Sequence, residues 1–234
     1  SATDDNYALD ATLTQPCSFG VTIQDFYSGP PWRWDLVNSL RVKLTNGVLS
    51  SAGDVAVLGG ANGLAIQNGD GAWEIVQFAN AVLTGPGEYC LTRLLRGRRG
   101  SEGAMRQPVA AGARVVVLDA ALAQLGLSAN EARQSFQYKW GPAPRPISDI
   151  AWQGMAMTFA DAAAIPLAPA HVRFVWDDGG GLTISWRRRD RAPAAASIVP
   201  AETAMSEARE AYDLEICKDG VAVRGFSGIA QHAQ

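Results

Sequence analysis

Short runs in which apolar and polar residues alternate dominate the chain and predict β-strands. The clearest is Leu40–Leu44, where three apolar side chains alternate with Arg41 and Lys43, as in a half-buried strand. The run over residues 115–118 is continuously apolar, which is typical of a strand covered on both faces. Further strands are predicted over residues 55–58, 64–66, 73–78, 88–95 and 136–140.

Turn and helix signals fall between these runs. Asn46-Gly47 favours a two-residue hairpin, and residues 85–87, with the sequence Gly-Pro-Gly, predict a second turn. Asp119 is placed to cap a short helix over residues 120–125. Ser128 and Glu131 have the spacing of a capping box. Together the patterns predict an all-β, mainly antiparallel fold with short helices.

An Ala/Pro-rich stretch over residues 162–169 predicts a domain boundary, with a β-rich domain over 1–164 and a second module over 165–234. In the second module, residues 171–176 and 182–186 read as a hairpin. A Pro/Ala-rich stretch at 191–210 then precedes alternating strands around the turn Asp219-Gly220. Short antiparallel strands of this kind are typical of a β-sandwich.

Composition narrows the function classes. The 234 residues carry a formal net charge of -3, so bulk charge predicts attraction neither to nucleic acid nor to membranes. No apolar stretch approaches the roughly twenty residues that span a bilayer. Cys17, Cys90 and Cys217 lie far apart, which favours reduced thiols over a disulfide framework or a zinc site. No cofactor and no metal are predicted.

Residues 91–102 place four arginines and two glycines behind an alternating apolar run. One hypothesis is an anion site, or an interface loop, built from Arg96, Arg98 and Arg99. The alternative is that the glycines satisfy a turn while Arg93 and Arg96 pair with acidic neighbours. The sequence alone does not decide between these two hypotheses.

Trp32 and Trp34 lie beside two prolines in a predicted loop. Exposed aromatic rings stack on sugars or anchor partner proteins, and core packing is the third alternative.

No arrangement of residues predicts catalysis. His171 starts a predicted strand and His232 lies near the end of the chain, and neither has a Ser or Cys partner in its sequence context. We therefore expect no enzymatic activity.

Five segments in this order resemble the C-terminal region of the large "megatron" tail-tip proteins of gene transfer agents and related siphophages, which are also called host-specificity proteins. They are LTRLLRGRRGSE at 91–102, GPAPRP at 141–146, PLAPAHVR at 166–173, LTISW at 182–186 and EAYDLEI at 210–216. The resemblance covers about two thirds of the chain, from roughly residue 70 onward.

The resemblance implies a structural component of a tail tip or baseplate that contributes to host attachment and DNA delivery. It implies other tail-tip proteins as partners, a homotrimer, and assembly in the bacterial cytoplasm into a virion or phage-like particle. It also implies a fibronectin type III-like module over 165–234. That module is expected to be incomplete, and the chain to be a fragment of a longer protein or completed by a neighbour.

The family's glycosidase-like barrel domain lies upstream of this region, so its activity does not carry over. Two alternatives remain beside the structural role. One is a carbohydrate-binding module that recognises host surface polysaccharide through Trp32 and Trp34. The other is a hydrolase of cell wall or polysaccharide.

Overall fold

The computed structural model describes residues 7–159, 166–190 and 209–229 and is all-β with antiparallel sheets, as the sequence predicts. The chain divides into two compact units, Ser1–Ile165 and Pro166–Gln234. The domain boundary predicted from the sequence lies between residues 164 and 165.

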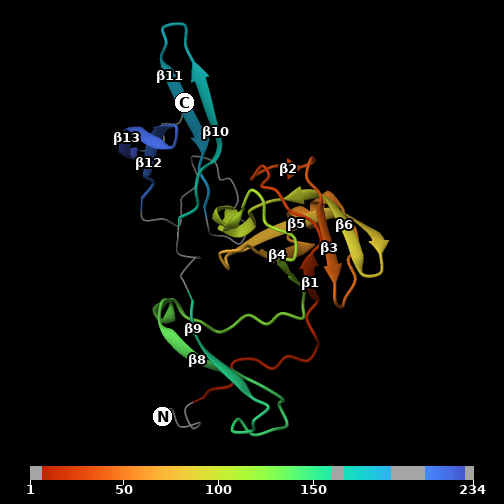
Figure 1. Cartoon of the computed structure of the whole chain (residues 1–234). Helices are drawn as coiled ribbons and strands as arrows, with labels where there is room; N and C mark the ends of the chain where they lie inside the picture. The colour runs from red at the N-terminus through yellow and green to blue at the C-terminus, as the bar shows by residue number, and fades with distance from the viewer. Residues whose placement is uncertain (1–6, 160–165, 191–208, 230–234) are drawn as a thin grey trace. The chain divides into compact units, whose positions relative to one another are not determined.

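Six antiparallel strands of the first unit close into a barrel (Figure 1). The strands follow one another around the barrel in the order β6–β3–β1–β7–β4–β5, and β5 pairs back onto β6. They are β1 (Phe19–Thr22), β3 (Leu40–Leu44), β4 (Gly63–Gln67), β5 (Trp73–Gly85), β6 (Glu88–Leu95) and β7 (Arg114–Val117).

The long strand β5 closes the barrel because it changes partner along its length. Its first residues, up to Gln77, pair with β4, and the residues from Gln77 onward pair with β6. The two-residue strand β2 (Trp34–Asp35) pairs with Leu94 and Leu95 at the end of β6. Closure leaves fewer strand edges unpaired than an open sheet would.

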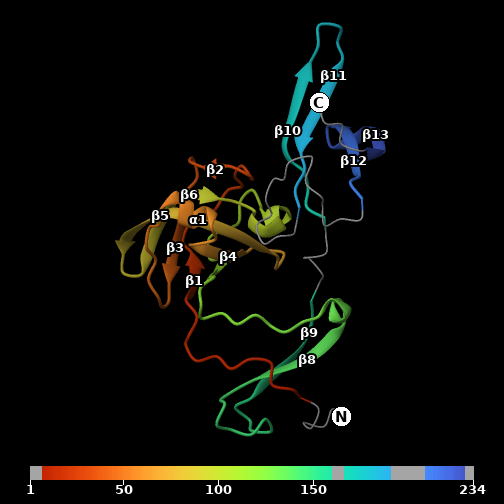
Figure 2. The same ribbon diagram turned by 180° about the vertical axis from the view of Figure 1, so that it is seen from behind.

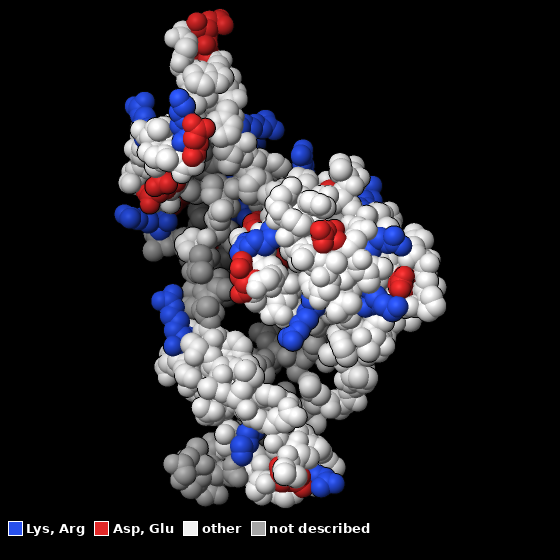
Figure 3. Space-filling view, in the orientation of Figure 1, with Lys and Arg blue, Asp and Glu red and all other residues white. Residues whose placement is uncertain are grey.

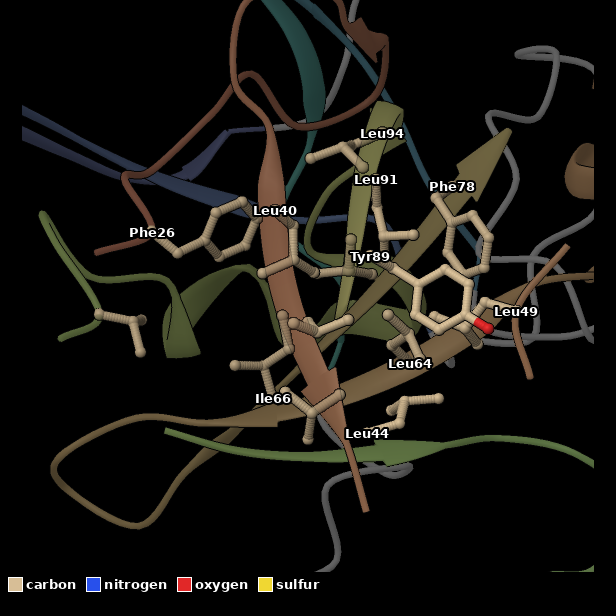
Figure 4. Packing of buried hydrophobic residues seen from close by; sticks show 14 residues of the cluster. Phe26, Leu40, Leu44, Leu49, Leu64, Ile66, Phe78, Tyr89, Leu91 and Leu94 are labelled. Carbon is tan, nitrogen blue, oxygen red and sulfur yellow. The ribbon is translucent and has the colours of Figure 1, made fainter. Parts of the chain in front are cut away.

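Inward side chains of the barrel strands form the main core. Leu40, Val42 and Leu44 are buried while the side chains between them face outward, which confirms the predicted alternation of β3. Figure 4 shows Phe26 beside Leu40, with the other labelled core side chains to the right of and below them. Each fully buried Leu or Phe contributes about 1.5–3 kcal/mol relative to an exposed one, so this cluster holds the barrel together.

The predicted strand over residues 55–58 is wrong, because this segment forms the short helix α1 (Asp54–Leu58). A brief apolar run does not distinguish helix from strand. Only one side chain of the helix, Val57, is buried, and it packs with Ala79 and Leu95 in a second, small core cluster. Figure 2 shows α1 lying against the barrel.

The predicted hairpin at Asn46-Gly47 is also wrong. Strand β3 pairs with β1 and β6, and the chain after it leads into α1. Gly47 does adopt a positive φ of 89°. The Asn46 amide donates to the carbonyl of Cys17 and its oxygen accepts from the amide of Phe19, so the turn anchors the start of β1 instead.

The predicted helix over residues 120–125 does not form. Asp119 caps only a single turn, in which its carboxylate accepts from the Ala121 amide. The capping box of Ser128 and Glu131 is confirmed and starts the short 3-10 helix η3 (Ala129–Glu131). It precedes a hairpin of β8 (Ser135–Trp140) and β9 (Gln153–Thr158).

The second unit contains two hairpins. The first joins β10 (Ala170–Trp176) to β11 (Leu182–Arg187), and the second joins β12 (Tyr212–Lys218) to β13 (Val221–Ile229). Both were predicted. The rings of Trp186 and Tyr212 meet edge to face with centroids 5.1 Å apart. Most of the Pro/Ala-rich stretch at 191–210 lies outside the described residues, and the fibronectin type III-like identity stays a prediction.

Candidate functional site

The arginine segment, residues 91–102, contains one charge that is buried. Arg96 follows the buried end of β6 and is 1% exposed. Its Nε and Nη2 donate to the two carboxylate oxygens of Glu74 at 2.7 and 2.9 Å, a bidentate pair. Its Nη1 donates to the carbonyl of Tyr27 at 2.7 Å, and its guanidinium lies 3.8 Å from the ring centre of Phe26.

Asp35 of β2 completes this cluster. Its Oδ2 lies 3.5 Å from Arg96 Nη1, and it accepts hydrogen bonds from the amides of Val37 and Asn38 and from the Asn38 side chain. Burial raises the pKa of Asp35, but these hydrogen bonds and the Arg96 charge outweigh it, so the pKa lies below its ordinary value. Asp35 is therefore an anion that the fold holds in place. We call Asp35, Glu74 and Arg96 the buried charge cluster.

The glycines of the arginine segment serve the backbone. Gly97 has a φ of 55°, and a Cβ there would lie 2.7 Å from Glu102 Cγ. Its amide also donates to Glu74 Oε1 at 3.2 Å. Gly100, inside the 3-10 helix η2 (Arg98–Ala104), has a φ of 80°. The sequence motif is therefore first of all a tight left-handed turn.

Arg98 and Arg99 differ from Arg96 in exposure. Arg98 is half-buried and donates from Nε to Gln77 Oε1 at 2.7 Å. Arg99 is exposed and has a φ of 56°. The structure therefore separates the three arginines of the predicted anion loop. Arg96 faces the interior, where its Nε and Nη2 bind Glu74. It thus pairs with an acidic neighbour, which is the alternative that the sequence left open beside an anion or interface loop.

Trp32 and Trp34 are half-buried and contact the same segment. Trp32 Nε1 donates to Glu102 Oε1 at 3.2 Å. The Arg93 guanidinium lies 4.9 Å from the ring centre of Trp34 and is also paired with Asp54. Both rings thus take part in the packing of this end of the barrel, and their contact with a glycan or a partner protein stays a prediction.

The partners of Arg96 were not identified from the sequence, although a signal for one of them exists. Glu74 lies two residues before Val76 and four before Phe78 on β5, and all three are buried. Because side chains alternate along a strand, this spacing places Glu74 on the inward face. A buried carboxylate requires a cationic partner.

The surface in view carries interspersed charges. Figure 3 shows lysines and arginines mixed with acidic side chains, with no large patch of one sign on that face. Within the described ranges, no group of three or more His, Cys, Asp or Glu side chains is placed to hold a metal ion. The three cysteines carry free thiols. His171 lies in β10, whereas His232 lies outside the described residues.

The described part of the chain contains no helix that is both long and apolar enough to cross a membrane.

The geometry defines a closed antiparallel β-barrel whose arginine segment is locked by a buried charge cluster. Residues 17–116 match the family model described as "Rcc01698-like, C-terminal". The match begins just before β1 and ends within β7, so it coincides with the barrel. It includes the arginine segment but not the later motifs of the sequence resemblance. No curated protein matches the chain.

Proposed function

We propose that the chain is a structural component of a phage-like tail tip or baseplate, which contributes to host attachment and DNA delivery without catalysis of its own. One observation carries the proposal: the family match coincides with the barrel, and its name is that of a protein family associated with gene transfer agents. The described fold is consistent with a structural role, because the buried charge cluster holds the arginine segment in one position.

Exposed apolar side chains support contacts with other proteins. Val82 and Leu83 are exposed near the end of the β5–β6 hairpin, and Phe174 and Trp176 are exposed on β10. Apolar surface of this kind is typical of interaction sites when it is contiguous. We propose other tail-tip proteins and further copies of this chain as the partners, in a particle that is assembled in the bacterial cytoplasm.

Deletion of the gene in the particle-producing strain tests the proposal. We expect particles that adsorb to host cells and transfer DNA at least tenfold less well, and recovery when the gene is restored. Unchanged adsorption and unchanged transfer would contradict the proposal.

Hydrolysis is tested separately with the purified chain. Soluble fragments released from peptidoglycan or host polysaccharide by this chain would favour the hydrolase alternative over a purely structural role.

A further inference from the structure

An open cleft of about 450 Å³ lies on the barrel between the segment after β1 and the segment before β3. Its lining residues come from these two segments and are Gln24, Asp25, Tyr27, Val37, Asn38 and Ser39. We call it the Tyr27 cleft. It is a shallow cleft that is largely open to solvent.

The buried charge cluster holds both walls of the cleft. Arg96 donates to the backbone carbonyl of Tyr27 on one wall. Asp35 accepts from the backbone and the side-chain amide of Asn38 on the other wall. Gln24 Nε2 also bridges to the Ser39 carbonyl at 3.3 Å. The walls are therefore set before any ligand arrives, which lowers the entropic cost of binding.

The polar groups of the cleft retain unused hydrogen-bonding capacity. In the described part of the chain, no hydrogen bond involves the Tyr27 hydroxyl, Gln24 Oε1 or Asn38 Oδ1. Asp25 uses one carboxylate oxygen to accept from the Ala111 amide. The lining residues thus carry a hydroxyl that can donate and accept, two amide oxygens and a carboxylate oxygen.

The chemistry matches a polyhydroxylated ligand. Tyr27 is 48% exposed, and its ring offers a surface on which the apolar face of a sugar can stack. Val37, which is 94% exposed, adds apolar surface to the lining. The only charge among the lining residues is the carboxylate of Asp25, which disfavours phosphates and acidic sugars by repulsion.

We infer that the Tyr27 cleft is a binding site for a neutral saccharide. The inference rests on the proposed function, since it names the ligand class that the barrel would contact during host attachment. It also relocates glycan recognition from Trp32 and Trp34, whose polar or π-contacts are made within the protein, to residues on the same connection between β1 and β3.

The test uses the full chain and saturation-transfer difference NMR. The probes are glucose, galactose, mannose, N-acetylglucosamine and their disaccharides, with galacturonic acid as the acidic comparison. We expect saturation transfer to at least one neutral sugar and none to galacturonic acid. Absence of transfer to every neutral probe, or stronger transfer to the acid, would overturn the inference.

Variants of the chain test whether the sugar binds in the Tyr27 cleft. Tyr27→Ala keeps the carbonyl that Arg96 binds and is expected to weaken affinity by about tenfold or more, as for loss of an aromatic anchor. Leu36→Ala is the matched control, because Leu36 is 70% exposed on the same connection and does not line the cleft. Equal affinity of Tyr27→Ala and the unaltered chain would overturn the inference.

The two proposals fail separately. If the chain binds sugar but deletion of the gene does not change adsorption, the proposed function is contradicted and the saccharide site in the Tyr27 cleft is supported. If the deletion strain loses adsorption but the chain binds no sugar, only the saccharide site in the Tyr27 cleft is contradicted.

Discussion

At the scale of single residues, Arg96 is the charge on which the loop geometry depends. It connects β5, through Glu74, to β2 and to the Tyr27 carbonyl. A buried ion pair is not in itself a large source of stability, but removal of one partner leaves the other charge uncompensated. The cluster therefore makes alternative positions of the loop costly.

Glu74→Gln is expected to lower the free energy of unfolding by about 3 kcal/mol or more, because Arg96 loses its bidentate partner in the interior. Urea denaturation of the full chain measures the loss. Glu88→Gln is the matched control, because Glu88 pairs with Lys43 at an exposed position and such pairs contribute about 0–1 kcal/mol. Equal losses in the two variants would contradict the structural role of the cluster.

Gly97→Ala is expected to destabilise the protein by about 1–2 kcal/mol, because Gly97 has a positive φ and a Cβ would contact Glu102. Gly103→Ala in the same segment serves as the control, since a Cβ there meets nothing within 4 Å. Thermal unfolding followed by circular dichroism compares the two. A similar melting temperature for both variants would show that the turn at Gly97 is not constrained.

The sequence predicted part of this site. It identified the arginine segment and the use of its glycines in a turn, because Gly-X-X-Gly with charged residues is a local signal. It left open whether Arg96 pairs or binds an anion, because Asp35 and Glu74 are distant in the chain. Only the closure of the barrel brings those two carboxylates to one guanidinium.

At the scale of elements, strands with clear alternation were predictable and short apolar runs were not. Strand β3 and strand β6 lie where the sequence placed them, because alternation over five or more residues specifies one buried face. Residues 55–58 became a helix, and residues 120–125 a single turn. In both, the local signal was brief and tertiary packing decided the outcome.

Tyr212 at the start of β12 gives a pH-dependent prediction. Burial and the hydrogen bond that Tyr212 donates to Glu210 raise the pKa of Tyr212 to about 12. An unfolded tyrosine titrates near pH 10. The unfolded state therefore loses this proton first, and the stabilisation, present below about pH 10, is lost as the pH rises toward about 12.

The measurement is the absorbance of tyrosinate as a function of pH, compared between the unaltered chain and Tyr212→Phe. We expect the difference to titrate near pH 12, and the variant to lose less stability between about pH 10 and 12. A difference that titrates near pH 10 would show that burial and the hydrogen bond to Glu210 do not raise the pKa of Tyr212.

At the scale of the whole molecule, we propose that the chain self-associates, as the family resemblance implies. We expect the full chain to sediment as a trimer at micromolar concentration. The mass of that species would be about three times the 24.8 kDa of one chain. Sedimentation velocity over a range of concentrations measures this. A monomer at every concentration would count against the assembly that the resemblance implies.

The barrel is the part of the molecule on which the structure and the family match agree. The resemblance extends from roughly residue 70 onward, whereas the match covers residues 17–116. The sequence placed residues 1–164 in one domain, but it did not predict strand β1, and its hairpin after β3 was wrong. Strands β1 and β3 reach their partners β7 and β6 only through long-range pairing, which a local pattern does not reveal.

The most direct test of the central claim is the position of the chain on purified particles. Gold-labelled antibodies against the barrel, viewed by electron microscopy, should mark the tail end that lies farthest from the head. Particles that carry no label, in preparations where the cell extract contains the protein, would contradict a role in the tail tip.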